Sequence, residues 1–403
     1  MSGAPPRLGR RGFLGYAGSA AAGAAVTGVG VVALGGESAP AGSPSGAAPA
    51  GRTLSPYGAH QPGVLAPAPR FVEQVSLDLA GDVDRDAVAR LMRLWTGDIE
   101  ALTSGRPAPG DTAPWLAAGN ADLTVTVGVG LGALSGRRLA NPPAGFVDVP
   151  AMSHDRLEPA WSGGDLVLLV GGGDGTTVAH AVRRLVADAR PFAALRWRQQ
   201  GFWNGVDERG RPMTGRNLFG QVDGSGNPRE GLRDVTVWIR DGPWAGGTTL
   251  VLRRIRMDLD RWDRLTGDQQ EAALGRRLAD GAPLSGGEEL DGLDLSVRAG
   301  GRPVIPLDAH ARRAHPSVNG GARILRKGAS YVREVSGPAG PRLEHGLLFA
   351  SFQADLERQF LPIQRSLDAS DALNAWTTAV GSASFAILPG FEEGGWLGQS
   401  VLG

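Results

Sequence analysis

The chain has 403 residues, of which 42% are hydrophobic and 20% are charged, as in an ordinary globular protein. Its 41 Lys+Arg balance its 41 Asp+Glu, so the charge favours neither nucleic acid nor an acidic membrane surface as a partner. Cysteine is absent, which excludes disulfides, thiolate metal ligands, iron–sulfur clusters and Cys-based zinc sites. Histidine chemistry must use one of six residues: His60, His154, His180, His310, His315 and His345.

The N-terminal segment has the pattern of a twin-arginine (Tat) export signal. Arg10 and Arg11 precede an uncharged, weakly hydrophobic run over residues 15–36. A transmembrane anchor is the alternative, but its many glycines and few large aliphatic side chains make insertion unfavourable. We expect residues 1–50 to be a Tat signal followed by an Ala/Pro/Gly-rich linker. Export by the Tat translocase would place the protein outside the cell, in the cell envelope or in the periplasm.

Residues 55–215 are predicted to form an N-terminal α+β domain. Apolar residues at helical spacing predict one helix, alternating or buried β-prone runs predict strands, and a second helix follows the last run. In chain order these are a strand over 72–79, a helix over 84–102, strands over 123–130 and 165–170, and a helix over 177–189. This order suits a ferredoxin-like unit, an antiparallel sheet flanked by helices.

Residues 216–403 are predicted to form a second ferredoxin-like domain with the same architecture, joined to the first between about 205 and 220. Its expected strands are 234–239, 247–257, 302–307, 346–353 and 382–388. Its expected helices are 258–265, 269–277 and 355–365. The fold class is therefore α+β with two domains.

The first segment that carries chemistry is residues 216–224, Arg-Asn-Leu-Phe-Gly-Gln-Val-Asp-Gly. Glycines at 220 and 224 flank Asp223 and predict a tight turn that holds its carboxylate towards a cavity. An Asx-type turn on the surface explains the same residues. Alone, the G-x-x-D-G motif does not decide between the two.

Two further segments follow. His310 lies between apolar and basic residues, where a neutral imidazole can ligate iron if a carboxylate holds its other nitrogen. Residues 323–331, which include Arg323 and Arg326, predict a strand whose one face presents arginines. The plainer alternatives are a structural histidine in a charged loop and a solvated basic edge strand.

Taken in this order, the three segments resemble the dye-decolorising peroxidase family, which carries a G-x-x-D-G motif, then a proximal haem histidine, then a distal arginine. The resemblance runs from the His-Gln-Pro-Gly sequence at 60–63 to Ser-Ala-Ser-Phe-Ala-Ile-Leu-Pro-Gly at 382–390, and includes Trp-Ile-Arg-Asp-Gly-Pro at 238–243 and Gly-Leu-Leu-Phe at 346–349. Within the family, the sequence is most similar to the A-type group, whose members commonly carry Tat leaders.

The resemblance implies one haem b per chain, with His310 as the axial ligand of its iron. It places Asp223 and Arg326 at the catalytic distal positions, where both also contact the haem. The sequence departs from the family at Gln221 and Val222, where Phe and Lys are common, and at Lys327, where a second arginine is common. These departures leave the three key positions intact and put the shape of the distal pocket in question.

The implied activity is that of a haem peroxidase, which uses hydrogen peroxide to oxidise dyes, phenols or other one-electron donors through a high-valent oxo-iron intermediate. Asp223 would move the peroxide proton, and Arg326 would stabilise charge on the departing oxygen. The proximal histidine needs a hydrogen-bond acceptor, for which Asp371 is the first candidate and Asp368 the second. Both aspartates would equally suit a helix cap.

Bulky substrates would require side chains that carry oxidising equivalents to the surface, and Tyr331 and Trp376 are candidates. The reductant, organic or metal, is open, as are a homo-oligomer and a partner oxidase that supplies peroxide. An exported haem-binding or iron-acquisition protein, similar to a deferrochelatase, is the alternative function.

A third hypothesis is a nucleotide-binding protein without haem, in which the Gly-Gly-Gly-Asp-Gly run at 171–175 binds phosphate. The run is similar to a phosphate-binding loop but lacks its Lys-Ser/Thr. We interpret the run as a tight turn between strand and helix, and His180 behind it as a packing or surface residue rather than a ligand.

Overall fold

The computed structural model describes residues 53–117, 121–137, 139–205, 207–209, 211, 213–337 and 340–403. The predicted Tat signal lies outside the described residues. The strands are β1 (Phe71–Leu79), β2 (Thr124–Gly130), β3 (Leu166–Gly172), β4 (Ala193–Phe202), β5 (Thr248–Met257), β6 (Arg298–Ala299), β7 (Arg302–Pro303), β8 (Leu325–Gly337), β9 (Gly340–Gln353) and β10 (Thr377–Ile387). The helices are α1 (Arg85–Thr103), α2 (Gly175–Ala189), α3 (Glu230–Val237), α4 (Leu259–Trp262), α5 (Gly267–Leu274), α6 (His310–Arg313), α7 (Leu361–Ser370) and α8 (Gln399–Leu402).

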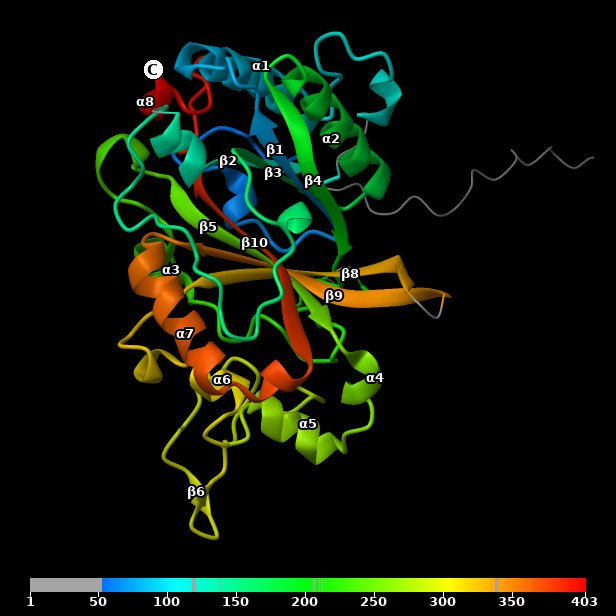
Figure 1. The fold of residues 1–403 in the computed structure, drawn as a ribbon, viewed down its shortest axis with the longest axis vertical. Helices are drawn as coiled ribbons and strands as arrows, with labels where there is room; N and C mark the ends of the chain where they lie inside the picture. The colour runs from blue at the N-terminus through cyan, green and yellow to red at the C-terminus, as the bar shows by residue number, and fades with distance from the viewer. Residues whose placement is uncertain are drawn as a thin grey trace, which may run out of the picture. The chain divides into compact units, whose positions relative to one another are not determined.

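Eight strands form one closed antiparallel barrel (Figure 1) in the order β1-β3-β2-β10-β5-β9-β8-β4. The first half of the chain contributes the neighbours β4-β1-β3-β2, and the second half contributes β10-β5-β9-β8. The halves join where β10 pairs with β2, and where Phe202 of β4 pairs with Ser330 of β8. The α+β class agrees with the sequence prediction, whereas the closure of all eight strands into one barrel was not predicted.

Most predicted elements lie within a few residues of the observed ones, with three exceptions. The strand predicted over 234–239 is wrong, because that segment belongs to helix α3 and the connection after it. The strand predicted over 302–307 is reduced to β7, a two-residue partner of β6. Strand β4 was not predicted, because only every fourth residue along most of its length is buried and the alternation typical of strands is lacking.

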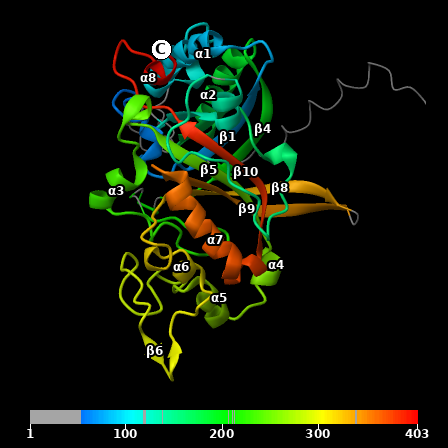
Figure 2. The ribbon, with the colours of Figure 1, turned by 60° about the vertical axis from the view of Figure 1, so that its left-hand side comes forward.

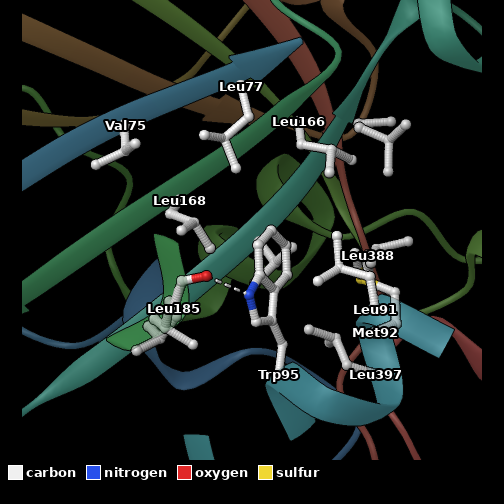
Figure 3. Packing of buried hydrophobic residues seen from close by; sticks show 14 of the residues in the cluster. Val75, Leu77, Leu91, Met92, Trp95, Leu166, Leu168, Leu185, Leu388 and Leu397 are labelled. Atoms are coloured by element: carbon white, nitrogen blue, oxygen red, sulfur yellow. Dashed lines mark hydrogen bonds between the residues drawn. The ribbon is translucent and has the colours of Figure 1, made fainter. Parts of the chain in front are cut away.

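Helices α1 and α2 cover the first half of the barrel directly. Helix α1 is capped by Asp84, whose side chain accepts a hydrogen bond from the backbone N–H of Ala87 at 2.8 Å. Trp95 of α1 is fully buried (Figure 3) and donates its indole N–H to the carbonyl oxygen of Leu185 in α2 at 2.9 Å. Around this ring pack aliphatic side chains of β1, β3, α1 and the C-terminal segment, among them Val75, Leu77, Leu91, Met92, Leu166, Leu168, Leu388 and Leu397.

The glycine-rich run at 171–175 is a connection from strand to helix, as interpreted from the sequence. Asp174 is the N-cap of α2 and accepts hydrogen bonds from the backbone N–H and the hydroxyl of Thr177, at 2.7 and 2.8 Å. His180 is buried further along this helix, and its Nε2 lies 2.8 Å from Asp111 Oδ2. The carboxylate of the run is therefore used for helix capping, which leaves the phosphate-loop hypothesis without support.

Helices α5, α6 and α7 lie at the other end of the barrel from α1 and α2 (Figure 1 and Figure 2). Helix α7 contacts α6 and the turn Leu356–Phe360 that precedes it. The long connection between α5 and β8, which contains α6, returns the chain to the barrel. Among the described residues, no helix is both long and apolar enough to span a membrane.

Candidate functional site

One cavity in the second half of the molecule collects the predicted site residues. Asp223, His310, Arg326 and Asp371 all line it. Its walls are formed by β5, β9 and β10, by the G-x-x-D-G segment, by α7, and by residues 152–155 from the first half of the chain. Its space, counted together with the open solvent at its mouth, is about 930 Å³.

His310 is the first residue of α6 and is fixed by Asp371. Its Nδ1 lies 2.6 Å from Asp371 Oδ2, and the side chain of Asp371 is only 6% exposed. The other oxygen of Asp371 accepts the backbone N–H of Leu373 at 3.0 Å, so the same carboxylate also caps the turn that follows α7. With Nδ1 donating to the carboxylate, a neutral imidazole carries its lone pair on Nε2, the nitrogen left to bind a metal.

The protonation of His310 reflects two opposing effects. Burial by itself lowers the pKa of His310, but the charge and hydrogen bond of Asp371 more than offset it, so the pKa is raised overall. The negative carboxylate thus makes the imidazole more basic. A more basic imidazole is also a stronger electron donor towards a metal ion.

Asp223 is held in the cavity by the turn that its flanking glycines allow. Gly220 has a φ of +79° and Gly224 a φ of +145°, values that residues with a Cβ rarely adopt. The backbone N–H of Asp223 donates to the carbonyl of Gly215 at 2.9 Å. This geometry points the carboxylate at Arg326, whose Nη1 lies 3.1 Å from Asp223 Oδ1.

Two asparagines that the sequence did not single out complete this arrangement. Asn217 donates from Nδ2 to Asp223 Oδ2 at 3.3 Å. Asn227 forms two hydrogen bonds of 2.9 Å with the backbone N–H and carbonyl of Arg326, which tie the loop after Asp223 to β8. An Asn six residues before a G-x-x-D-G aspartate carries no recognisable signal by itself, because its partner is defined only by the folded turn.

A buried ion pair, also missed, lines the cavity. Arg253 of β5 pairs with Asp155, and their side chains are 4% and 5% exposed. We call residues 152–155 the strap, because this segment of the first half lines the cavity of the second. Asp368 of α7 holds the strap, accepting the backbone N–H and hydroxyl of Ser153 at 2.8 Å each.

The remaining residues discussed from the sequence have other positions. Asp368 binds the strap, whereas Asp371 binds His310. Arg323, the other arginine that the sequence offered for the distal position, is absent from the lining of the cavity, and its carbonyl accepts a hydrogen bond from Gln359. Lys327 points away and donates from Nζ to the carbonyls of Gly63 and Ala66, and burial lowers its pKa to about 7.

The two aromatic candidates differ in their surroundings. Trp376 contacts Trp262 edge to face, at 5.4 Å between centroids. Trp262 stacks on Phe219, which lines the cavity, at 4.4 Å. Tyr331 is 1% exposed and hydrogen-bonded to Glu344 at 3.2 Å, and burial raises its pKa to about 12. Trp376 therefore stands at the end of an aromatic path from the cavity, whereas Tyr331 is enclosed.

Two family models match the chain. The model described as Dyp-type peroxidase, N-terminal, matches residues 61–203, and the model described as Dyp-type peroxidase, C-terminal, matches residues 214–392. Among relatives, the chain is 40% identical to a dye-decolorizing peroxidase of Thermobifida fusca, over 98% of this chain and 97% of the relative. It is also 33% identical to a deferrochelatase of Yersinia pestis, over 86% of this chain and 84% of that protein.

Solved structures agree. A DyP-type peroxidase from Cellulomonas bogoriensis superposes with a TM-score of 0.83 at 45% identity, covering 88% of this chain and 99% of that chain. The ferric form of DtpA from Streptomyces lividans superposes with a TM-score of 0.82 at 38% identity, covering 88% and 98%. The chain therefore belongs to the DyP-type peroxidase family, whose members are haem peroxidases that use hydrogen peroxide.

Proposed function

We propose that the cavity binds one haem b per chain and that His310 is the axial ligand of its iron. The observation that carries this assignment is the His310–Asp371 pair at 2.6 Å in the lining of the cavity. The donor set fits haem, because one imidazole nitrogen is free for iron and the walls offer a hydrophobic surface for a porphyrin. That surface is formed by Phe219, Ile255, Met257, Leu347, Phe349 and Leu373.

Haem bound here would supply a redox-active iron at which hydrogen peroxide is reduced. Asp223 would take the proton from one peroxide oxygen and deliver it to the other, as a general acid and base. Arg326, fixed 3.1 Å from that carboxylate, would stabilise negative charge on the departing oxygen. The two side chains are held as one pair, so we assign the distal chemistry to both without ranking them.

Electron donors too large for the cavity would deliver electrons through surface aromatics. The contacts of Phe219 with Trp262 and of Trp262 with Trp376 support Trp376 as the exit of such a path. The two hydrogen-bonded neighbours of Tyr331, Arg254 and Glu344, enclose its hydroxyl and favour a structural role for it. Dyes, phenols or metal ions remain the candidate reductants.

The finer classification is also proposed. We infer two ferredoxin-like units, because both halves repeat one strand order, β4-β1-β3-β2 and β10-β5-β9-β8. The Arg10-Arg11 pattern supports A-type membership and export through the Tat translocase to the cell exterior, envelope or periplasm. The candidate protein partners are a second copy of the chain and an oxidase that supplies peroxide.

The alternative function is haem handling. Relatives such as the Yersinia pestis protein are named deferrochelatases, and a strap that lines the cavity and is held by Asp368 suits a protein that admits and releases its cofactor. A carrier would release haem or iron and turn over peroxide poorly. The distal pair of Asp223 and Arg326 favours the peroxidase.

An absorption experiment tests the proposal. The protein is produced with haem supplementation beside a His310→Ala variant, and one equivalent of hydrogen peroxide is then added. A His-ligated peroxidase gives a Soret band that weakens or shifts in the variant, and a fast spectral change with peroxide in the wild type. Haem bound through His310 but inert to peroxide would favour haem handling. Absence of haem in the wild type would contradict both functions.

A further inference from the structure

The amide of Asn217 has only one orientation that fits its surroundings. The backbone N–H of Phe219 donates to Asn217 Oδ1 at 3.0 Å. A backbone N–H is a fixed donor, so the oxygen of the amide must face it and the NH₂ group must face the opposite way. Asn217 is 7% exposed, which leaves water little access to exchange these partners.

Both remaining hydrogens of that amide have acceptors in the cavity wall. Nδ2 of Asn217 lies 3.0 Å from Oε1 of Gln221 and 3.3 Å from Oδ2 of Asp223. Gln221 lies two residues before Asp223 in the same G-x-x-D-G segment. Its carbonyl oxygen takes one N–H, so that the other is directed at the carboxylate.

Asp223 is consequently held through both oxygens. Arg326 contacts Oδ1 at 3.1 Å, and Asn217 contacts Oδ2. An N–H donated to a carboxylate is stronger than one donated to a neutral group. Such contacts are often long in the ligand-free state and shorten when the substrate is bound.

We propose that Asn217 is a positioning residue for Asp223 and that Gln221 sets the direction of its amide. Asn217 fixes the rotation of the carboxylate, so that Asp223 meets peroxide in one orientation beside Arg326. This inference rests on the proposed function, since it assigns a task to Asp223. The contact itself, however, belongs to the protein without haem and can be measured there.

Asn217→Asp is the primary variant, because it keeps the oxygen that accepts the N–H of Phe219 and replaces the donors with a second carboxylate oxygen. At neutral pH the introduced carboxylate repels Asp223, and we expect the second-order rate of the peroxide-induced Soret change to fall about 10- to 100-fold. Below about pH 4 the introduced carboxyl becomes protonated and can donate, so the rate should recover towards that of the wild type at the same pH.

Two further variants complete the set. Gln221→Leu leaves the donors in place but frees one of them, and we expect a smaller loss, about 2- to 5-fold. Asn141→Asp adds the same charge at an exposed position and should leave the rate unchanged. A loss for Asn217→Asp that does not depend on pH, or no loss at all with normal haem content, would overturn the proposal.

A cycle in the apoprotein tests the contact without the cofactor. Asn217→Asp, Asp223→Asn and the double variant are unfolded with urea. The double variant restores a donor and an acceptor with exchanged places, so its midpoint should lie above the value expected from adding the two single shifts. Additive shifts would contradict the contact. A wild type that fails to bind haem or react with peroxide would instead contradict the proposed function, and the cycle would still report on the pair.

Discussion

The two halves of the barrel have the same strand order, but one is closely packed and the other holds the cavity. In the first half, α1 and α2 pack directly on the sheet, and Trp95 fills the space between them. In the second half, β5 and β9 present Ile255, Leu347 and Phe349 to a cavity. The difference lies in the connections, because a long segment carrying α6 stands between α5 and β8. A packed half provides stability, and a half whose covering elements stand away from the sheet provides a site.

The largest expected effect contrasts the two sheet faces. Trp95→Ala should lower the free energy of unfolding by about 3–5 kcal/mol, since it leaves a void in a closed core. Ile255→Ala should cost less, about 2 kcal/mol in the apoprotein, at the lower end for such truncations, because this side chain already borders the cavity. Urea unfolding of both apoproteins measures the difference. Equal losses would show that the second half packs as tightly as the first.

The next effect concerns the His310–Asp371 pair in the half that holds the cavity. Asp371→Asn removes the charge that holds and polarises His310, and should weaken haem binding about 10- to 100-fold. Titration with haem, followed by the Soret band, measures the affinity. Asp260→Asn, the same change at an exposed position, is the control. Unchanged affinity in Asp371→Asn would mean that His310 needs no acceptor.

A buried acid in the packed half should give stability the opposite dependence on pH from an ordinary carboxylate. Burial, followed by the hydrogen bond and charge of Asp188, raises the pKa of Asp98 to about 8. The folded state therefore holds this proton more tightly than the unfolded state. The resulting stability is complete below the unfolded pKa of about 4 and is lost as the pH rises through about 8.

Asp98→Asn retains a donor for Asp188 and removes the titration. The unfolding free energy of the variant minus that of the wild type should therefore increase by at least about 1 kcal/mol when the pH is raised from 5 to 8. Urea unfolding at both pH values measures this change. Parallel losses in both proteins over that interval would show that Asp98 is already ionised when folded.

The smallest effect concerns the strap that joins the halves. Asp368→Ala removes the acceptor of the Ser153 hydrogen bonds and should destabilise the strap by about 1 kcal/mol. Haem transfer to apomyoglobin should then be several-fold faster, with an unchanged Soret position. Asp260→Ala is the matched control. An unaltered transfer rate would mean that the strap does not limit release.

The sequence predicted regular elements better than their assembly. The β-prone composition of residues 123–130 and the helical spacing along α1 are local signals, and both predictions agree with the structure. Strand β4 escaped because most of its side chains are exposed. The Asp-Val-Thr-Val run at 234–237 resembles a strand, but after Pro228 it continues a helical turn and forms α3.

The site could be proposed mainly through the family resemblance. Asp223, His310 and Arg326 are far apart in sequence, and no local pattern places them around one cavity. Their catalytic roles stay predictions, although the structure brings all three together. The contacts of Asn217 and of Asp155 with Arg253 depend on side-chain positions after folding, which periodicity and spacing do not encode.

The closure of the barrel also sets an order of events during biosynthesis. The cavity needs the strap from the first half and Thr377 and Ala379 from β10, the last barrel strand to be made, which closes the barrel against β2. A nascent chain that has passed His310 therefore still lacks a wall of its cofactor site. Haem binding would therefore require that synthesis has passed β10 and that β10 has paired with β2.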